Sequence, residues 1–261
     1  MLFKKAKKYI DYIIVKITQK IRQKEYKYNG ERIKYLLYRN KESKDLIIVF
    51  SSCTRVGIKA RYNYVRTLKK INANKLFILD DGASDNRGTY YLGVYPEFEF
   101  EKATISLVDK IYKETNPTNT FFIGSSKGGY SALNFGVKYS ESKIIIGAPQ
   151  YFLGTYLNNM KNNVTIKSMN CLSSKAISYL DNYLYSQIKE YSNNNSKVFL
   201  QYSKNDITYD EHIKYLIEDL HKHDYELSIQ ILDYKNHDDV SLSFPQYILN
   251  CLKIYIGGDS N

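Results

Sequence analysis

The chain has 261 residues, enough for one large α/β domain with an ample core. Hydrophobic residues make up 43% of it and charged residues 25%, which excludes collagen-like, mucin-like and wholly disordered classes. The net charge is +11, but residues 1–24 carry +7 of this and leave only +4 for the rest. Because no RRM, KH, zinc-finger or helix-turn-helix signature accompanies this charge, we expect no nucleic-acid partner.

The cysteines and the apolar runs indicate the compartment. Cys53, Cys171 and Cys251 are widely spaced and odd in number, so they predict neither a disulfide framework nor a zinc site. The longest uncharged apolar run near the N-terminus spans only Tyr12–Val15, far less than a signal-peptide core or a spanning helix needs. We therefore expect a cytoplasmic protein.

Residues 1–24 form the first predicted element, a basic amphipathic helix. Its apolar residues recur at helical spacing opposite the lysines, at Phe3, Ala6, Ile10, Ile13, Ile14, Ile17 and Ile21. Such helices lie in the surface of anionic membranes, so we expect peripheral attachment to the inner face of the membrane. The alternative is that the apolar stripe packs against the domain or a partner subunit. The sequence leaves the oligomeric state open.

Beyond residue 24 the pattern predicts an edge hairpin and then a mostly parallel, doubly wound α/β sheet. Asn29-Gly30, between two short alternating segments, is the hairpin signal. Short apolar runs predict strands at 46–50, 75–79, 120–123, 143–146, 198–202 and 227–232. Helical patterns lie at 62–71, 101–114, 127–139, 209–223 and 245–256. The segment 151–195 is too long for an ordinary crossover. Its pattern predicts a helical cap inserted into a single domain that spans residues 25–261.

The strongest functional signal is the G-x-S-x-G segment Gly124-Ser125-Ser126-Lys127-Gly128. It follows an apolar strand and precedes an amphipathic helix, which is the context of a nucleophile elbow. Flanking glycines permit the sharp turn, and the helix N-terminus favours a developing oxyanion. The motif therefore predicts Ser126 as a nucleophile. The alternative is an ordinary glycine-rich turn between strand and helix.

A serine nucleophile needs a base and an acid that orients the base. Asp206 follows the next-to-last predicted strand, and His237 follows the last. This order, with Ser126 first, resembles that of the α/β-hydrolase superfamily, and the resemblance covers residues 26–256. It implies that Ser126 is the nucleophile, His237 the general base and Asp206 the carboxylate that holds the imidazole tautomer.

Other residues compete for these roles. Asp210 is the alternative acid, although a carboxylate there would also suit the N-terminus of the following helix. Asp238 and Asp239 flank the histidine and are expected to be loop or capping residues. The segment His221-Lys222-His223 lacks a carboxylate or cysteine cluster, so we expect a solvated helix end rather than a metal site. The mechanism needs no metal and no cofactor.

The oxyanion hole is expected to combine the Lys127 N–H with an N–H from the loop after strand 46–50. That loop departs from the His-Gly pattern of many lipases and leaves open whether Ser52 or Cys53 supplies the second donor. The Lys127 side chain has two interpretations. It binds an anionic group of the substrate, or it points to solvent from the helix start.

A polar loop with aromatic residues follows strand 75–79, at the sheet edge where α/β proteins bind ligands. Asp81, Arg87 and Tyr91 of this loop suit a hydroxylated, sugar-like substrate and are predicted to bind it; the alternative is a turn capped by aspartates. The stretches FILDDGASDNRGTYYLG and IIIGAPQYFLGTYL resemble hydrolase- and acyltransferase-like proteins of bacterial capsule and surface-glycan clusters.

These features predict a serine-dependent acyl-ester hydrolase or O-acyltransferase that forms an acyl-Ser126 intermediate. Its partners would be an acyl donor and a carbohydrate-related substrate. Hydrolysis and transfer use the same three side chains, so the sequence leaves them open. The alternative from another class is a noncatalytic scaffold of a glycan-biosynthesis complex, against which the presence of all three side chains argues. A dehalogenase is less favoured because it usually carries a carboxylate at the elbow.

Overall fold

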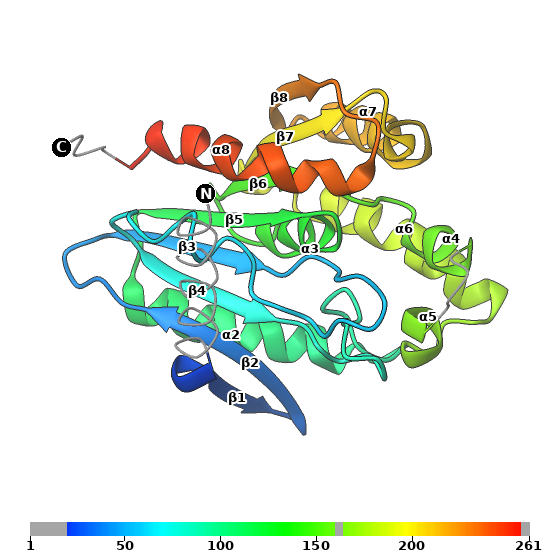
Figure 1. Ribbon diagram of the computed structural model, residues 1–261, viewed down its shortest axis with the longest axis horizontal. Helices are drawn as coiled ribbons and strands as arrows, with labels where there is room; N and C mark the ends of the chain where they lie inside the picture. Colours follow the sequence, from blue (N-terminus) through cyan, green and yellow to red (C-terminus); the bar gives the residue numbers. More distant parts are fainter. Residues whose placement is uncertain (1–19, 160–163, 257–261) are drawn as a thin grey trace, which may run out of the picture.

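The computed structural model describes residues 20–159 and 164–256, and its centre is an eight-stranded sheet (Figure 1). The strand order is β1-β2-β4-β3-β5-β6-β7-β8. Strand β2 runs antiparallel to both of its neighbours, and all other neighbours are parallel. The strands are β1 (Lys24–Tyr28), β2 (Glu31–Tyr38), β3 (Asp45–Phe50), β4 (Asn74–Leu79), β5 (Asn119–Ser125), β6 (Lys143–Gly147), β7 (Lys197–Ser203) and β8 (Glu226–Leu232).

The middle and the edges of this sheet differ in sequence for a physical reason. Strands β3, β5 and β6 are covered on both faces and are therefore almost continuous apolar runs. The edge strands β1 and β8 expose much of their length and carry more polar residues. At the hairpin, Asn29 and Gly30 have φ angles of 47° and 85°, which a two-residue turn of this type requires. The predicted hairpin and strands are confirmed.

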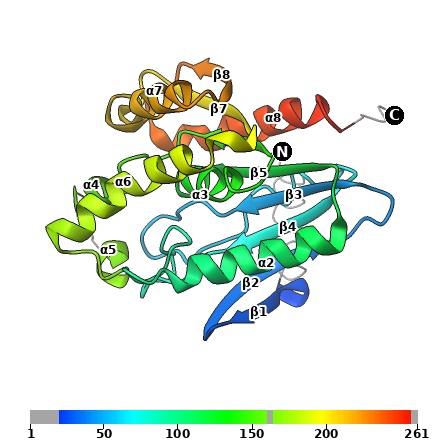
Figure 2. The same cartoon turned by 180° about the vertical axis from the view of Figure 1, so that it is seen from behind.

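Helices cover both faces of the sheet. Figure 2 shows α2 and α3 in front of the strands, whereas α8 lies in front in Figure 1, on the opposite face. The helices are α2 (Glu99–Thr115), α3 (Lys127–Gly136), α4 (Leu153–Asn159), α5 (Val164–Ser168), α6 (Ser174–Glu190), α7 (Lys214–Lys222) and α8 (Val240–Lys253). Three short helical turns are η1 (Ser192–Asn194), η2 (Tyr209–Ile213), which is π-helical, and η3 (His237–Asp239).

The helices α4, α5 and α6 follow β6 and precede β7, in the part of the chain where the insertion 151–195 is predicted. They lie together beyond one end of the sheet (Figure 1). Helix α6 begins after Ser173, whose side chain accepts a hydrogen bond from the Ala176 N–H, a favourable N-cap.

The prediction of a helix at 62–71 is wrong. The segment forms successive turns, and Tyr64 has a φ of 58°, which a right-handed helix does not accommodate. The Lys75 ammonium donates to the carbonyl oxygens of Leu68 and Ile71 at 3.2 and 2.7 Å. The same carbonyls accept from the Ile71 and Ala73 N–H groups of the turns at 3.1 Å each, so the ammonium of the next strand adds to turn hydrogen bonds rather than to a regular helical ladder.

The last helix begins earlier than predicted. The sequence predicts a helix at 245–256, whereas α8 begins at Val240 and contains Pro245. Its first turns pack on the sheet: Phe244 is fully buried, and its ring fills the space that a side chain at Gly147 would need. Packing against β6 therefore extends the helix toward η3, which carries His237.

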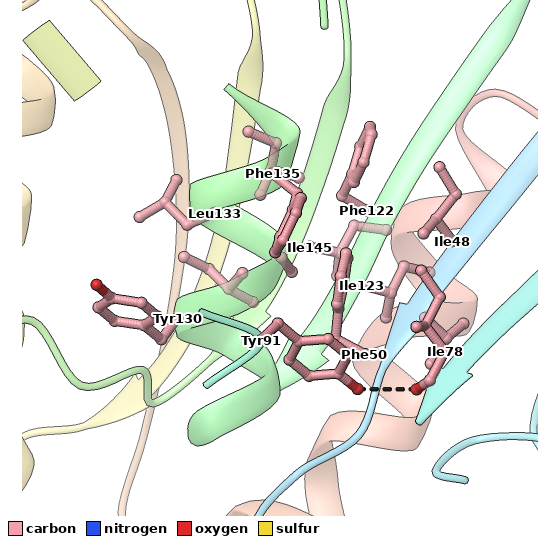
Figure 3. Packing of buried hydrophobic residues seen from close by; sticks show 14 of the residues in the cluster. Ile48, Phe50, Ile78, Tyr91, Phe122, Ile123, Tyr130, Leu133, Phe135 and Ile145 are labelled. Carbon is pink, nitrogen blue, oxygen red and sulfur yellow. Dashed lines mark hydrogen bonds between the residues drawn. The ribbon is translucent and has the colours of Figure 1, made fainter. Parts of the chain in front are cut away.

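Aromatic and aliphatic side chains of β3, β5 and α3 pack together in the core (Figure 3). Phe50, at the end of β3, stacks on Phe135 of α3 with ring centroids 5.1 Å apart and meets the Tyr91 ring edge-on at 5.0 Å. The Tyr91 hydroxyl donates to the Ile78 carbonyl at 2.8 Å and accepts from the Ser51 N–H at 2.6 Å. This packing holds the end of β3 against the beginning of α3.

Candidate active site

Ser126 lies on the turn between β5 and α3 in strained backbone, with φ 51° and ψ −123°. The turn is so tight that a Cβ at Gly124 would lie 2.1 Å from the Gly128 carbonyl oxygen. A Cβ at Gly128 would lie 2.6 Å from the Phe50 carbonyl oxygen. Only glycine fits at either position, which explains the spacing of the motif. The Ser126 N–H donates to the Gly147 carbonyl at 2.8 Å and holds the elbow against β6.

His237 and Asp206 join Ser126 in a continuous chain of hydrogen bonds. Ser126 Oγ lies 2.9 Å from His237 Nε2, and His237 Nδ1 lies 2.9 Å from Asp206 Oδ2. The structure therefore brings together the three residues singled out by chain order, with the imidazole between hydroxyl and carboxylate. Asp210, the alternative acid, lies instead on η2 and pairs with Lys214 at 3.4 Å.

The Asp206 carboxylate is only 1% exposed. Burial raises the pKa of this carboxyl, but hydrogen bonds from His237 and from the Thr208 N–H outweigh the burial and leave its pKa below the ordinary value. Asp206 is therefore ionised at neutral pH. An anion beside Nδ1 keeps the proton on that nitrogen, so Nε2 is free to accept the proton of Ser126.

A further side chain contacts the serine oxygen. Gln150, in the loop after β6, is fully buried, and its Nε2 donates to Ser126 Oγ at 3.2 Å. Its Oε1 accepts from the Tyr90 hydroxyl at 3.4 Å. Gln150 could not be predicted from the motifs, because a lone glutamine forms none. The signal that could have found it is its position just after the strand that neighbours β5.

Ser126 opens onto a cavity of about 980 Å³. The connection between β3 and β4 (residues 52–67), His237 and the start of α8 line it. Its charged residues are Lys20, Arg55, Arg61, Arg66, Asp238 and Asp239, so basic groups are in excess. In the described part of the chain, no residue of the predicted cap, 151–195, lines this cavity. The connection 52–67 supplies most of the residues that line it instead.

Hydroxyl groups cluster beside the nucleophile. The Tyr64 hydroxyl lies 2.5 Å from Ser125 Oγ, and Ser52 Oγ donates to the Ser125 carbonyl at 2.9 Å. Burial raises the pKa of Tyr64 to about 12, so this hydroxyl keeps its proton. The Ser52 N–H already donates to Asn63 Oδ1 at 3.0 Å. Of the two candidates for the second oxyanion donor, this favours Cys53, which is exposed and lines the cavity.

Both predictions for the Lys127 side chain are wrong. The side chain is 1% exposed, and its ammonium donates to the Asp80 carboxylate at 3.0 Å and to the Arg87 carbonyl at 2.9 Å. Asp80, which is fully buried, also accepts from the Thr89 and Tyr91 N–H groups. A buried ion pair therefore ties the start of α3 to the end of β4. The Lys127 N–H is at the first helical position, where no intrahelical partner is available.

The structure does not bring the predicted substrate-binding residues to Ser126. Asp81 pairs with Lys34 at 2.6 Å, and Arg87, which is 4% exposed, pairs with Asp85 at 2.6 Å. Tyr91 is fully buried, and none of the three lines the cavity. Their contacts hold the loop after β4 in place, as the alternative of a structural turn predicts. No cluster of three or more metal-ligating side chains occurs between residues 20 and 256, residues 160–163 aside.

His212 is a buried histidine outside this site. It lies in η2, is 3% exposed, and accepts from the Phe152 N–H through Nδ1 at 3.3 Å. Its Nε2 has no hydrogen-bond partner among the described residues. Burial lowers the pKa of His212 to about 4, because a charged imidazole is disfavoured away from water.

We expect His212 to make the protein less stable in acid. Between its ordinary pKa of 6.5 and its folded value of about 4, the unfolded chain binds a proton that the folded chain does not. The free energy of unfolding therefore falls by up to about 3 kcal/mol as the pH falls through this window. Urea unfolding at neutral pH and near pH 4 measures this loss of stability. The loss should be smaller in His212→Asn than in the wild type, and the asparagine side-chain oxygen can still accept from the Phe152 N–H.

The exposed His221 of α7 provides the control for this measurement. His221→Asn should keep the wild-type loss of stability in acid. A loss in His212→Asn equal to that of the wild type would contradict the assignment.

No protein-family model and no curated protein sequence matches this chain. Solved structures do match. The capsule O-acetyltransferase of Neisseria meningitidis serogroup A is 24% identical with a TM-score of 0.74, over 88% of this chain and 94% of that one. A Glycosylation Associate Protein complex from Streptococcus agalactiae gives 20% identity and a TM-score of 0.71, over 90% of this chain but 47% of the other. A fluorophosphonate-binding serine hydrolase of Staphylococcus aureus is 12% identical with a TM-score of 0.62, over 90% of this chain and 98% of that one.

Proposed function

We propose that this chain, which has the α/β-hydrolase fold, is a serine acyltransferase. It would move an acyl group from a thioester donor to a hydroxyl of a carbohydrate. The observation that carries the proposal is the hydrogen-bonded chain of Ser126, His237 and Asp206 at an elbow that opens onto a basic cavity. Structures of similar fold support it, since one is a capsule O-acetyltransferase in complex with CoA and another is a serine hydrolase.

In the first half-reaction, His237 Nε2 takes the hydroxyl proton while Ser126 Oγ attacks the acyl carbonyl carbon. Asp206 stabilises the imidazolium that forms. Negative charge develops on the carbonyl oxygen, for which the N–H groups of Lys127 and Cys53 are the proposed donors. When the carbon–sulfur bond breaks, the imidazolium gives its proton to the departing sulfur. The products are acyl-Ser126 and a free thiol.

In the second half-reaction, a sugar hydroxyl takes the place of the thiol. His237 removes its proton, the oxygen attacks the acyl-serine ester, and Ser126 Oγ leaves with the proton returned by the imidazolium. The products are a sugar ester and the free enzyme. Water at the same place would give hydrolysis, so transfer requires the acceptor to displace water beside Ser126. The connection 52–67 lines this space.

The charge of the cavity supports a phosphate-bearing thioester such as an acyl-CoA as the donor. Arg61 and Arg66 are exposed on the cavity wall, and guanidinium groups bind phosphates through paired hydrogen bonds. Arg55 is partly neutralised by its ion pair with Asp238 at 2.8 Å. The volume of about 980 Å³ lies at the upper end of the range for small-molecule sites and exceeds what a short acyl ester alone would need.

Two measurements on the full-length protein test the proposal. A fluorophosphonate should label Ser126, as mass spectrometry of the labelled peptide would show. Release of free thiol from acetyl-CoA should then rise when an oligosaccharide acceptor is added. A rate of thiol release that does not change when the acceptor is added would indicate a hydrolase. If the protein is not labelled and releases no thiol, the second candidate function is favoured, a noncatalytic scaffold. The similarity to the Glycosylation Associate Protein complex supports this candidate.

We also propose that the protein is cytoplasmic and that residues 1–24 attach it to the inner face of the membrane. Residues 1–19 lie outside the described part of the chain, and the proposal rests on their charge and apolar stripe. Among the described residues, no helix combines the length and apolarity that crossing a bilayer requires. Gln23 accepts from the Tyr62 hydroxyl at 3.1 Å and, with Lys20, lines the cavity.

We expect the full-length protein to sediment with vesicles that contain anionic lipid and to be released by salt. Each basic residue near an anionic surface contributes about 1 kcal/mol, and the apolar stripe adds burial in the interface. A shortened chain that begins at Lys20 keeps the cavity wall and should lose vesicle binding but not Ser126 labelling. Equal binding to neutral vesicles would contradict electrostatic attachment. A shortened chain that unfolds would show that the segment packs on the domain.

A further inference from the structure

We infer that Gln150 is a catalytic residue that holds Ser126 Oγ in position for attack and stabilises the charge on this oxygen. The inference rests on the proposed function, in which Ser126 is the nucleophile. Its basis is the contact of 3.2 Å from Gln150 Nε2 to Ser126 Oγ, a second hydrogen bond to the oxygen that His237 also contacts.

Tyr90 determines which end of the Gln150 amide faces the serine. The Tyr90 hydroxyl donates to Oε1 at 3.4 Å, so the NH₂ group is directed to Ser126. Burial raises the pKa of Tyr90 well above its ordinary value, so this hydroxyl keeps the proton that it donates. The Tyr90 ring is held edge-on against Tyr130, with centroids 5.5 Å apart. The same orientation follows from Ser126: its proton is directed to His237, so Oγ accepts from the amide NH₂ group.

The hydrogen-bonding capacity of the serine hydroxyl shows what the amide does. A hydroxyl has one proton and two acceptor lone pairs. The Ser126 proton is directed to His237 Nε2, because Asp206 holds the other imidazole nitrogen in its protonated form. One lone pair accepts from Gln150, and the other is left for attack on the acyl carbon. Without the amide, the hydroxyl can rotate away from this arrangement.

The same hydrogen bond strengthens during the reaction. Oγ is partly anionic when it attacks and again when it leaves the acyl group, because proton transfer is then incomplete. A hydrogen bond to an ionised oxygen is about twice as strong as one between neutral groups, and Gln150 is fully buried, where such bonds are little weakened by water. The amide therefore stabilises the transition state more than the ground state. Its loss should lower kcat and leave KM nearly unchanged.

A purely structural role would use some of the same contacts, since Gln150 also links its loop to Tyr90. The test must therefore report on the serine oxygen itself. The rate at which a fluorophosphonate labels Ser126 does so, because the reaction needs nucleophilic attack but neither an acyl donor nor an acceptor. Labelling rates, pH–rate profiles and thermal unfolding of the full-length variants would be measured together.

We expect Gln150→Met, which keeps the side-chain length but removes the donor, to slow labelling about 10²-fold. Tyr90→Phe, which only frees the amide to turn, should slow it by a smaller factor. Gln150→Glu should also slow labelling at neutral pH, because an ionised carboxylate accepts hydrogen bonds and cannot donate one to Ser126 Oγ. The pH–rate profile of each variant shows whether the slower labelling persists at pH values where the base is fully deprotonated, as the loss of a donor to Oγ requires.

Gln201 provides the matched control. It is likewise a buried glutamine, 1% exposed, and its Nε2 donates to Gln230 Oε1 at 2.7 Å, one strand away from β6. Gln201→Met should lower the melting temperature without slowing the labelling of Ser126. If this control slows labelling as much as Gln150→Met does, the effect is one of packing and the inference is overturned.

The remaining outcomes separate this inference from the proposed function. If the wild-type protein is not labelled, the proposed function fails. If the wild type is labelled and Gln150→Met reacts at the same rate, the proposed function stands and the role of Gln150 is overturned. Should Gln150→Met not fold, the Tyr90→Phe and Gln150→Glu variants decide the question, and wild-type labelling rates in both would overturn the inference.

Discussion

Replacement of Ser126 by alanine is expected to lower acyl transfer about 10³-fold or more and to leave the fold intact. The change removes the oxygen that would carry the acyl group and, among the described residues, deletes the hydrogen bonds of this oxygen to His237 and Gln150. His237→Ala should lose nearly as much. The double variant should lose little more than either single one, because the residues act as a unit. Thiol release from the acyl donor and thermal unfolding measure the two effects.

Ser142→Ala is the control for Ser126→Ala. Ser142 is also a fully buried serine, and its hydroxyl bonds to the Gly136 carbonyl at 2.8 Å and to Ser196 at 3.0 Å. We expect this variant to lose stability and keep its activity. Full activity in Ser126→Ala or His237→Ala would rule out the acyl-serine mechanism.

Asp206→Asn is expected to lower turnover about 10⁴-fold. Asp206 Oδ1 accepts from the Thr208 N–H at 3.1 Å, and Oδ2 faces His237 Nδ1. An asparagine would place its oxygen on the Thr208 N–H and its NH₂ group against Nδ1. The imidazole would then carry its proton on Nε2, where it can no longer accept the proton of Ser126. Turnover with the acyl donor would show the loss, with thermal unfolding as the check on folding.

Asp210→Asn makes the same chemical change at the alternative acid. Its carboxylate is 74% exposed and pairs only with the exposed Lys214 among the ion pairs of the described residues. We expect turnover within about two-fold of the wild type, since exposed ion pairs contribute little. A severe loss in Asp210→Asn together with a mild one in Asp206→Asn would reassign the acid.

The strands and the triad could be predicted because local patterns and chain order determine them. Buried strands need continuous apolar runs, and the carboxyl ends of neighbouring parallel strands lie at the same edge of the sheet. Residues that follow β5 and β7 at this edge, such as Ser126 and Asp206, are therefore expected near one another. The glycines of the elbow add a backbone requirement that is visible in sequence.

Side-chain directions could not be predicted, because they depend on residues far away along the chain. Nothing near Lys127 in sequence indicates that its ammonium is buried against Asp80 of another strand. The segment 62–71 shows helical spacing, yet Tyr64 and Lys75 hold it in turns over the cavity. Gln150 could not be predicted for the same reason, since only the packed structure shows that its amide contacts Ser126 Oγ.

The buried ion pair of Lys127 and Asp80 restricts how this sequence can diverge over time. Loss of either partner leaves an unpaired charge in the interior and costs about 3–5 kcal/mol, out of the 5–15 kcal/mol or so that keeps a domain folded. Two apolar residues of similar volume can be as stable as the pair, but a chain with only one of the two changes is not. Relatives that replace the lysine after the serine are therefore expected to replace the acidic residue at the end of β4 as well.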